Sequence, residues 1–387
     1  MALAGAVIAI CAVLLPTFLR GRGTMLLKIG EQAALFSAAF SMPDAGLALL
    51  RERLRPLPPI YGSELYEGSL KPEGAEETTR ESAWPSPQTQ ATDQEKAPST
   101  PSTPTANSPR RPVQPTDIPQ EYAGPVIAEN FAGYDEGAWV RWRNGYIKND
   151  TRHNDEQVLA ILEQEWATTF ENIMEPQVLI LHTHATESYE LFDRDSYDTR
   201  NTWRSTDNTN NMVAVGDAMA AVLNENGIGV LHDTTQHDYP SYNGSYERSA
   251  ETIKQYLADY PSIKVVLDLH RDAIQRADAI VKPVAMIEGQ KAAQIMIIAA
   301  CDDGEMGIPN WRENWRFAAL FQDTMEQFYP ELTKPAFFCY RKYNMDLTPG
   351  SLLLEFGSNA NTLEEAVYSA QLAGQALSYL IWSNVVG

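Results

Sequence analysis

The amino-acid sequence predicts an α/β fold for residues 121–387, with a mostly parallel sheet flanked by helices. Apolar runs of strand length alternate there with helical patterns, and such alternation is typical of sheets with helices on both faces. Two further observations predict what precedes this domain. Residues 2–19 carry no charge, and the composition changes sharply near residue 67. We therefore expect a membrane segment and a disordered linker ahead of the folded domain.

Length and charge limit the classes of protein to consider. The chain has 387 residues, of which 44% are hydrophobic, so it can bury a large core without a disulfide framework. Its formal net charge is −21, and it contains no run of Lys or Arg that could form a basic face. Because nucleic-acid binding needs such a face, we exclude nucleic acid as a partner. The acidity suits a soluble, extracytoplasmic surface.

Cysteine usage excludes a thiolate metal site. The three cysteines are Cys11, Cys301 and Cys339, and no two of them form a CxxC pair. Cys301 and Cys339 lie in strand-like runs, where lone cysteines are typically reduced core residues. We expect both to be reduced, with a bridge between them as the alternative.

The apolar segment 2–19 ends at Arg20 and Arg22. About 17–20 apolar residues are enough to cross the hydrocarbon core of a membrane as a helix. No A-x-A cleavage site directly follows the apolar run, so we interpret residues 1–22 as a single-pass membrane anchor. A cleaved signal peptide and a buried helix are the alternatives.

A spacer separates this segment from the folded domain. Residues 23–66 mix apolar and charged positions and are interpreted as a juxtamembrane helical region. Residues 67–120 are rich in Pro, Ser, Thr, Glu and Gln. Such a composition buries too little apolar surface to offset the entropy of ordering, which predicts a disordered linker. The arrangement indicates a domain tethered to the cell membrane on its extracytoplasmic side.

The strands and helices of the folded domain follow from the length and periodicity of its apolar runs. Gly227 and Pro261 are typical of helix ends and close the first two helices. The expected strands are 178–182, 228–232, 265–269, 279–287, 294–300, 336–340 and 351–355, and the expected helices are 210–226, 246–259, 311–328 and 361–383.

Three side chains suited to metal binding or proton transfer fall at the ends of predicted strands. His184 comes just after the strand VLILH, His270 ends the strand VVLDLH, and Glu355 ends the strand SLLLE. In an open α/β sheet the ligand crevice lies beyond the carboxyl ends of the strands. The placement of all three at such ends indicates a common site.

Zinc hydrolysis needs imidazole and carboxylate ligands, an open coordination position, and a carboxylate that moves the proton of the attacking water. His184, Glu187 and His270 are the candidate ligands, and Glu355 is the candidate acid/base. A structural, hydrogen-bonded role is the simpler interpretation of any one histidine, whereas a carboxylate inside an apolar strand end is seldom unpaired. The third ligand stays open. Its alternatives to Glu187 are His182, Asp198 and Asp207.

Five ordered motifs make the chain similar to a known family. They are HTHATESY, HDTTQHDYPSYNGSYERS, VVLDLHRDA, YNMDL and LLLEFGSNANTLEEA. In these motifs the chain resembles stage II sporulation protein P over roughly residues 122–387. That family resembles the zinc N-acetylmuramoyl-L-alanine amidases in the residues of its active site. Its domain organisation also includes an N-terminal anchor and a spacer.

The resemblance implies a zinc amidase-like catalytic domain acting on peptidoglycan. It implies cleavage of the amide between N-acetylmuramic acid and L-alanine, and also of peptide cross-links. His184 matches the histidine of the family's THxxES motif, His270 that of its LHRD motif, and Glu355 the glutamate of its LLLE strand. In the wider amidase class the third ligand is a glutamate that usually lies farther from the first histidine than Glu187 does, so this ligand stays open.

The resemblance also implies a biological setting. The expected role is thinning of the septal wall and engulfment during sporulation, at the septum or the engulfing membrane. The expected partners are a membrane protein of the engulfment machinery and a lytic transglycosylase.

Four further residues of the motifs are candidates for weaker roles. Arg271 and Asp272 follow His270 and could orient it, with a structural salt bridge as the alternative. Arg248 and Asn344 lie in polar, aromatic loops where a glycan strand or stem peptide could rest, with loop packing as the alternative.

Two other functions compete with the amidase. A non-catalytic scaffold that binds the wall would be favoured by loss of a histidine or of the glutamate, but all three residues are present. A (β/α)₈ amidohydrolase needs about 250 residues, whereas only about 200 follow His184.

Overall fold

The computed structural model describes residues 117–132 and 139–386. The expected membrane segment 1–22, the juxtamembrane region 23–66 and nearly all of the expected linker lie outside the described residues. Among the helices of the described part, none combines the length and the apolar character that crossing a membrane requires.

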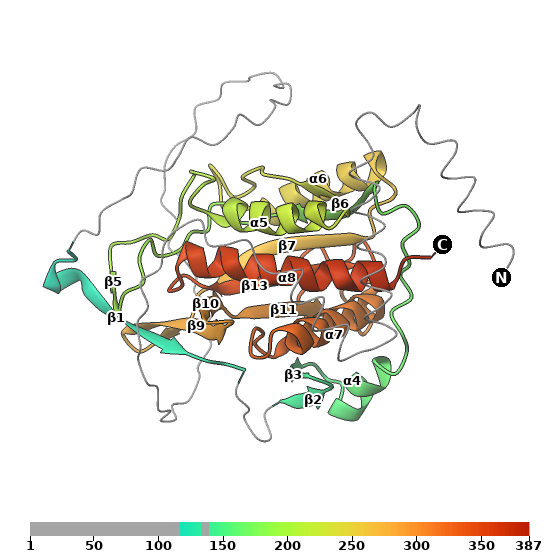
Figure 1. The fold of residues 1–387 in the computed structure, drawn as a ribbon, viewed down its shortest axis with the longest axis horizontal. Coiled ribbons are helices and arrows are strands. Elements are labelled where there is room, and N and C mark those ends of the chain that lie inside the picture. Colours follow the sequence, from blue (N-terminus) through green and yellow to red (C-terminus); the bar gives the residue numbers. More distant parts are fainter. Residues whose placement is uncertain (1–116, 133–138, 387) are drawn as a thin grey trace, which may run out of the picture.

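The described residues form a mixed α/β fold with two sheets and flanking helices (Figure 1). In the described part of the chain the larger sheet has eight strands, and five of its seven strand pairs are parallel. The antiparallel pairs are β2 with β3 and β11 with β13. In spatial order the strands are β2 (Val140–Trp142), β3 (Gly145–Asp150), β12 (Ala336–Cys339), β11 (Ile295–Ala300), β13 (Ser351–Ser358), β7 (Val265–Asp272), β4 (Pro176–Leu181) and β6 (Gly229–His232).

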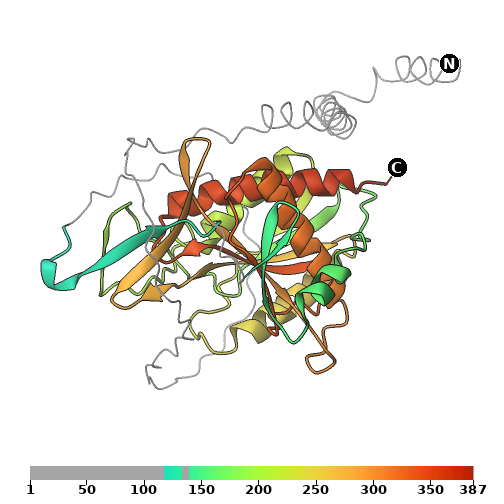
Figure 2. The same ribbon diagram turned by 90° about the horizontal axis from the view of Figure 1, so that it is seen from below.

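Helices cover both faces of this sheet. Helix α8 (Leu363–Ser383) packs between α5 (Met212–Glu225) and α7 (Trp311–Phe328) on one face. Helix α6 (Ser245–Asp259) lies on the opposite face, which the perpendicular view in Figure 2 shows most clearly. The short helix α4 (Asp155–Ile161) follows β3.

Alternation along the strands explains this layering. In β4, Val178 and Ile180 join the core under α5 and α8, whereas Leu179 and Leu181 pack with Ile253 of α6. Since successive side chains of a strand point to opposite faces, a strand that is apolar on both faces must be covered on both. The sequence of β4, PQVLIL, therefore requires the two helical layers.

A second, smaller sheet lies beside the first and extends away from it (Figure 1). Lys282 of β9 pairs with Glu365 Oε1 over 2.7 Å, and Glu365 also completes the capping box that begins α8 at Thr362. This ion pair joins the small sheet to the main core. Its strands are β10 (Gln290–Ala293), β9 (Ala279–Ile287), β1 (Ala123–Glu129) and β5 (Ser196–Asp198), with β8 (Gln275–Arg276) pairing with β9 and a 3₁₀ turn (Gln120–Tyr122) before β1.

The expected elements of the domain are present, with differences in arrangement. The run 279–287 is a strand, but it belongs to the small sheet, and β11 runs antiparallel to β13. The short elements before residue 176 and the strands β5, β8 and β10 were not expected, because they lack a long apolar run. Cys301 and Cys339 are buried and reduced, as expected.

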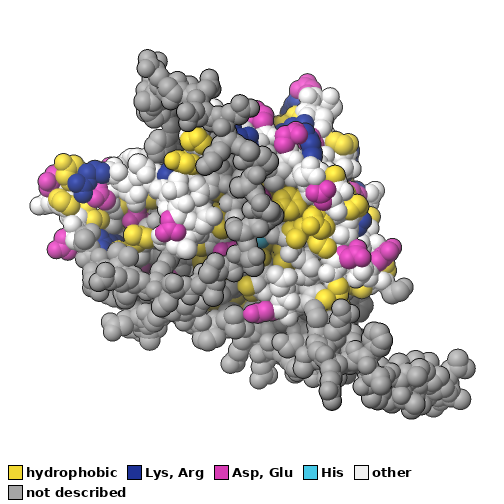
Figure 3. Space-filling model, turned by 90° about the horizontal axis from the view of Figure 1, so that it is seen from above, with side chains coloured by type: hydrophobic (Ala, Val, Ile, Leu, Met, Phe, Trp, Pro, Cys, Tyr) yellow, Lys and Arg dark blue, Asp and Glu magenta, His cyan; other side chains and the backbone are white. Residues whose placement is uncertain are grey.

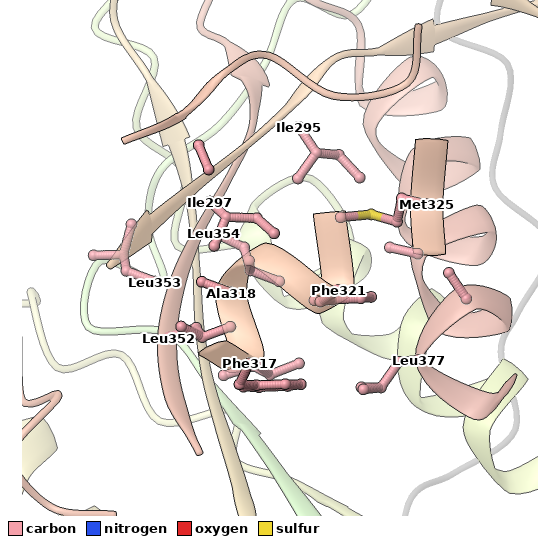
Figure 4. Close-up of a cluster of buried hydrophobic side chains, with 14 of the residues drawn as sticks. Ile295, Ile297, Phe317, Ala318, Phe321, Met325, Leu352, Leu353, Leu354 and Leu377 are labelled. Atoms are coloured by element: carbon pink, nitrogen blue, oxygen red, sulfur yellow. The ribbon is translucent and has the colours of Figure 1, made fainter. Parts of the chain in front are cut away.

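The larger core lies between the sheet and helices α5, α7 and α8. Figure 4 shows Phe317, Phe321 and Met325 of α7 pointing toward apolar side chains of β11, β13 and α8. Phe317 and Phe321 stack at 5.9 Å and are fully buried. This packing holds β13, and with it Glu355, at the centre of the sheet.

The core predicts a large loss of stability on truncation. The substitution Phe321→Ala should lower the free energy of unfolding by about 3–5 kcal/mol, because it removes buried surface and leaves a cavity. Urea unfolding followed by tryptophan fluorescence measures this. Met286→Ala is the control, since Met286 is 59% exposed and should change stability by less than about 0.5 kcal/mol. A loss below 1 kcal/mol for Phe321→Ala would contradict the packing described.

Candidate metal centre

The loop after β4 carries two of the candidate ligands. His184 lies three residues beyond the end of the strand, and the Glu187 N–H donates to the His184 carbonyl over 3.1 Å. This turn puts both side chains on one side of the loop, with Glu187 Oε1 3.6 Å from His184 Nδ1. The local backbone turn therefore brings the side chains of His184 and Glu187 together.

Strand β7 brings the third candidate ligand beside them. Because β7 pairs in parallel with β4, the carboxyl ends of both strands meet at one edge of the sheet. His270 Nδ1 lies 3.5 Å from Glu187 Oε2, and the two imidazole rings are 5.0 Å apart, edge to face. One ligand atom from each of the three residues lies within 4.8 Å of the others.

The cluster is buried: His184 and Glu187 are 7% exposed and His270 is 3% exposed. On the face seen in Figure 3, histidine shows only as a small area beside hydrophobic side chains. Two imidazoles and a carboxylate are zinc ligands of the type found in catalytic sites, which use three protein ligands. Among the described residues, this is the one group of three such side chains close enough to share an ion.

The charges of the cluster are those of a cation site. Burial alone would raise the pKa of Glu187, but hydrogen bonds from His184 and His270 and the charge of Arg271 hold it well below its usual value. Burial would likewise lower the pKa of His270, but the Asp268 and Glu187 carboxylates raise it well above the usual value. The carboxylates thus attract positive charge to the place where the ligand atoms converge.

Glu355 stands beside this cluster. It lies on β13 in register with His270 on β7, and its Oε2 atom is buried without a hydrogen-bond partner among the described residues. Burial and the neighbouring Asp272 carboxylate raise the pKa of Glu355 to about 8. The strand continues beyond it through a bulge at Gly357, whose φ of 66° favours glycine. The structure therefore places a carboxyl group of raised pKa next to the ligand cluster.

Arg271 holds the ligand loop in place. Its backbone N–H donates to Glu187 Oε2 over 3.2 Å. Its guanidinium donates to the carbonyls of Ser188 and Trp203 over 2.9 and 3.1 Å. Arg271 therefore positions the Glu187 loop, and its contacts are to Glu187 rather than to His270.

Aromatic rings and one cation line the rim of the centre. Tyr242, which is 51% exposed, stacks on His184 at 4.6 Å. Arg204 lies over the Tyr242 ring, with its guanidinium 2.8 Å from Asp238 and 3.7 Å from Glu187 Oε1. Tyr246 stacks on His270. One side of the centre is thus partly open beside Tyr242.

With this geometry established, comparison with known proteins gives the family. The model of the family "Stage II sporulation protein P (SpoIIP)" matches residues 71–378, well over half of the chain. The chain belongs to the SpoIIP family. This confirms the resemblance drawn from the five motifs. Stage II sporulation protein P of Bacillus subtilis (strain 168) is 30% identical over 216 residues. That match covers 53% of this chain and 51% of the relative, about half of its length.

Several solved structures are similar to this SpoIIP-family chain at low identity. The apo N-acetylmuramyl-L-alanine amidase Ami1 of Mycobacterium abscessus is 13% identical, with a TM-score of 0.31, covering 53% of this chain and 99% of that one. The CwlD amidase of Clostridioides difficile, solved in complex with the GerS lipoprotein, is 10% identical, with a TM-score of 0.32 and coverage of 54% and 96%. TM-scores of this size carry no conclusion about the site.

The alternatives for the third ligand lie elsewhere in the SpoIIP-family fold. His182 points into the core, with Nδ1 3.1 Å from the Leu269 carbonyl and Nε2 2.8 Å from His232, and burial lowers its pKa to about 3. Asp198 lies on β5 and pairs with Arg200 over 2.6 Å. Asp207 accepts hydrogen bonds within its own turn. The structure brings none of the three to the ligand cluster.

The residues proposed to contact substrate or to orient His270 form hydrogen bonds with other residues of the protein. Arg248 donates to the carbonyls of residues 237, 241 and 243, and Asn344 donates to the Tyr246 carbonyl and to Ser249. Asp272 accepts from Lys334 over 3.1 Å and acts electrostatically on Glu355. Arg248 and Asn344 thus hold loops, and Asp272 does not contact the His270 ring in the manner expected of an orienting partner.

The sequence analysis missed Asp268, Arg204 and Tyr242. Asp268 carried a readable signal, because a residue two positions before His270 on a strand points to the same face of the sheet. Arg204 and Tyr242 carried none, because they come from loops that only the fold brings together.

We expect the wild-type protein to bind about one zinc ion per chain, with affinity depending on all three clustered side chains. The substitution His270→Asn should abolish stoichiometric binding in an assay that measures bound zinc after gel filtration. His153→Gln is the matched control, since His153 stacks on Trp311 far from the cluster in the fold and should retain zinc. Full zinc content in the His270 variant would contradict the site.

The raised pKa of Glu355 predicts a pH dependence for the metal-free protein. Its usual pKa is 4.5 and its folded value about 8, so between these values the folded state holds a proton that the unfolded state has lost. The contribution of Glu355 to the free energy of unfolding therefore falls as pH rises through this window. Glu355→Gln should remove that part of the slope, measured by urea unfolding in a chelator at pH 5 and pH 8.5. Parallel slopes for both proteins would contradict the pKa.

Proposed function

We propose that this chain is a zinc-dependent peptidoglycan hydrolase of the SpoIIP family that cleaves the amide between N-acetylmuramic acid and L-alanine. The observation that carries the proposal is the buried His184–Glu187–His270 cluster with the partner-free oxygen of Glu355 beside it. Membership of the SpoIIP family supports the sporulation setting. The match covers 51% of the length of the Bacillus subtilis relative. The activity of the whole protein is therefore part of the proposal.

In this proposal His184, Glu187 and His270 hold the zinc ion. Bound there, zinc supplies Lewis acidity that polarises an amide carbonyl. Glu187 also offsets the positive charge of the ion, and Arg271 keeps the Glu187 loop from moving away from β7. The burial of the cluster keeps bulk water out, which strengthens each of these electrostatic interactions.

Glu355 is the proposed general base and acid. Its free Oε2 atom can accept the proton of the attacking water and then deliver it to the departing L-alanine nitrogen. Burial raises the pKa of Glu355 in the metal-free protein, and a cation bound in the neighbouring cluster would lower it and favour the ionised form that accepts the proton. Asp272 contributes to that pKa through its charge, and Lys334 bonded to Asp272 moderates it.

The rim supports a sugar-peptide substrate. Tyr242 is 51% exposed beside His184, so the exposed part of its side chain is available to contact a sugar ring or peptide stem. Arg204 lies at the same rim, but Asp238 already pairs with its guanidinium over 2.8 Å and offsets its charge. Cleavage of peptide cross-links is a second reaction that the same site chemistry would permit.

The proposed location is the extracytoplasmic side of the cell membrane. Residues 1–22 would anchor the chain, and residues 67–120 would give the domain reach toward the septal wall. A membrane protein of the engulfment machinery and a lytic transglycosylase are the proposed partners, on the basis of the family alone.

The test compares wild type with Glu355→Gln on purified sacculi. Wild type should release stem peptides with a new L-alanine amino terminus, identified by mass spectrometry. Glu355→Gln should reduce the rate at least about 100-fold, since it removes the proton-transfer group. It should retain zinc, because Glu355 is outside the ligand cluster.

Three controls and outcomes complete this test. Glu364→Gln is a matched control on the surface of α8 and should leave the rate unchanged. Removal of zinc with a chelator should stop release, and added zinc should restore it. Wall binding with bound zinc but no bond cleavage, alone and with a transglycosylase present, would overturn the proposal and leave the non-catalytic scaffold.

A further inference from the structure

A buried carboxylate lies behind His270, on the side away from Glu187. Asp268 Oδ1 lies 2.9 Å from His270 Nε2, while His270 Nδ1 faces Glu187. Asp268 is 4% exposed and is two residues before His270 on β7, so both side chains project from the same face of the sheet. His270 is thus held between two carboxylates, one on each ring nitrogen.

Asp268 is itself held by hydrogen bonds from Thr183 in the loop after β4, and α6 supports Thr183 in turn. Thr183 donates its N–H to Oδ1 over 2.8 Å and its hydroxyl to Oδ2 over 2.6 Å. Ser249 lies 2.7 Å from the Thr183 hydroxyl, and Asn344 donates to Ser249 over 3.0 Å. In this series of hydrogen bonds, each hydroxyl or amide group can donate toward the Asp268 carboxylate. The carboxylate therefore stays ionised and keeps a fixed orientation.

The other histidine of the cluster has a carboxylate beside only one ring nitrogen. The Nε2 atoms of both histidines are buried, but only that of His270 has a carboxylate recorded beside it among the described residues, at 2.9 Å. His184 faces Glu187 through Nδ1 over 3.6 Å, and its ring is contacted by Tyr242 and Tyr246.

We propose that Asp268 is the positioning residue of the metal centre, which keeps the His270 proton on Nε2 and leaves Nδ1 free to bind the ion. A neutral imidazole has one N–H, and a carboxylate at Nε2 keeps that proton there. The carboxylate also raises the basicity of the ligating nitrogen, as outer partners of zinc-bound histidines generally do. Thr183 and Ser249 extend this support to α6. The proposal rests on the zinc site of the proposed function.

The experiment measures zinc affinity by competition with a chromophoric chelator, in the full chain and independently of hydrolysis. The substitution Asp268→Asn keeps the side-chain volume but removes the charge and one acceptor, and should weaken zinc binding about 10–100-fold. The visible spectrum of the cobalt-substituted variant should also differ from that of wild type, because the orientation of His270 changes.

Two further sets of variants keep the test decisive. Thr183→Val removes the hydroxyl that holds Asp268 and should also weaken zinc binding, whereas Thr183→Ser keeps it and should restore wild-type affinity. These two Thr183 variants test the proposal if the Asp268→Asn variant does not fold. Asp233→Asn is the matched control, because Asp233 is a buried carboxylate bonded to a different histidine, His237, over 3.3 Å, and zinc affinity should not change.

Zinc affinity within threefold of wild type for both folded Asp268→Asn and Thr183→Val would overturn the proposal. Equal weakening by Asp233→Asn would also overturn it, since the effect would then be general destabilisation. A wild-type chain that binds no zinc overturns it together with the proposed function. A chain whose zinc affinity depends on Asp268 but that releases nothing from sacculi overturns the proposed function alone.

Discussion

The buried carboxylate of Glu187 is the constraint on which the candidate centre depends. A carboxylate removed from water is costly unless positive or hydrogen-bonding groups surround it. Here two imidazoles face its two oxygens, and the backbone N–H of Arg271 donates to one of them. These contacts tie together the loop after β4 and the end of β7. A metal cation at the same place would satisfy the same charge.

Parallel strand pairing is what makes that arrangement available. Because β4 and β13 both pair in parallel with β7, the residues that follow or end the three strands meet at one edge of the sheet. The core of Figure 4 fixes β13 from one face of the sheet, and α6 packs on the other face against β4 and β7. A site made of short side chains needs such rigid support, since small displacements of ligand atoms weaken metal binding and proton transfer alike.

Three carboxylates near the centre differ in their surroundings, and the differences support the roles proposed for them. Asp268 accepts two hydrogen bonds from Thr183 and faces His270, so it remains ionised and holds a ring in place. Glu187 is shared by two imidazoles and is the proposed carboxylate ligand. Glu355 has a buried oxygen without a partner and a raised pKa, so it is the one able to exchange a proton. Environments that push the pKa values of like groups apart are typical of acid–base catalysis.

The sequence by itself determined the α/β class, most strands and helices, and the candidate site residues His184, His270 and Glu355, with Glu187 as one of four candidates for the third ligand. It could do so because apolar run length and periodicity depend on neighbouring residues, and because the ends of parallel strands meet at one edge. The tertiary structure decided the rest. It turned His182 into the core and away from the cluster, assigned Arg271 to the Glu187 loop, and placed Asp268 behind His270. The outcomes for His182 and Arg271 depend on contacts between residues about 50 to 90 positions apart, which no local pattern records. Except for β9, the strands of the small sheet were missed for the same reason, since they are short and are stabilised by partners distant in the chain.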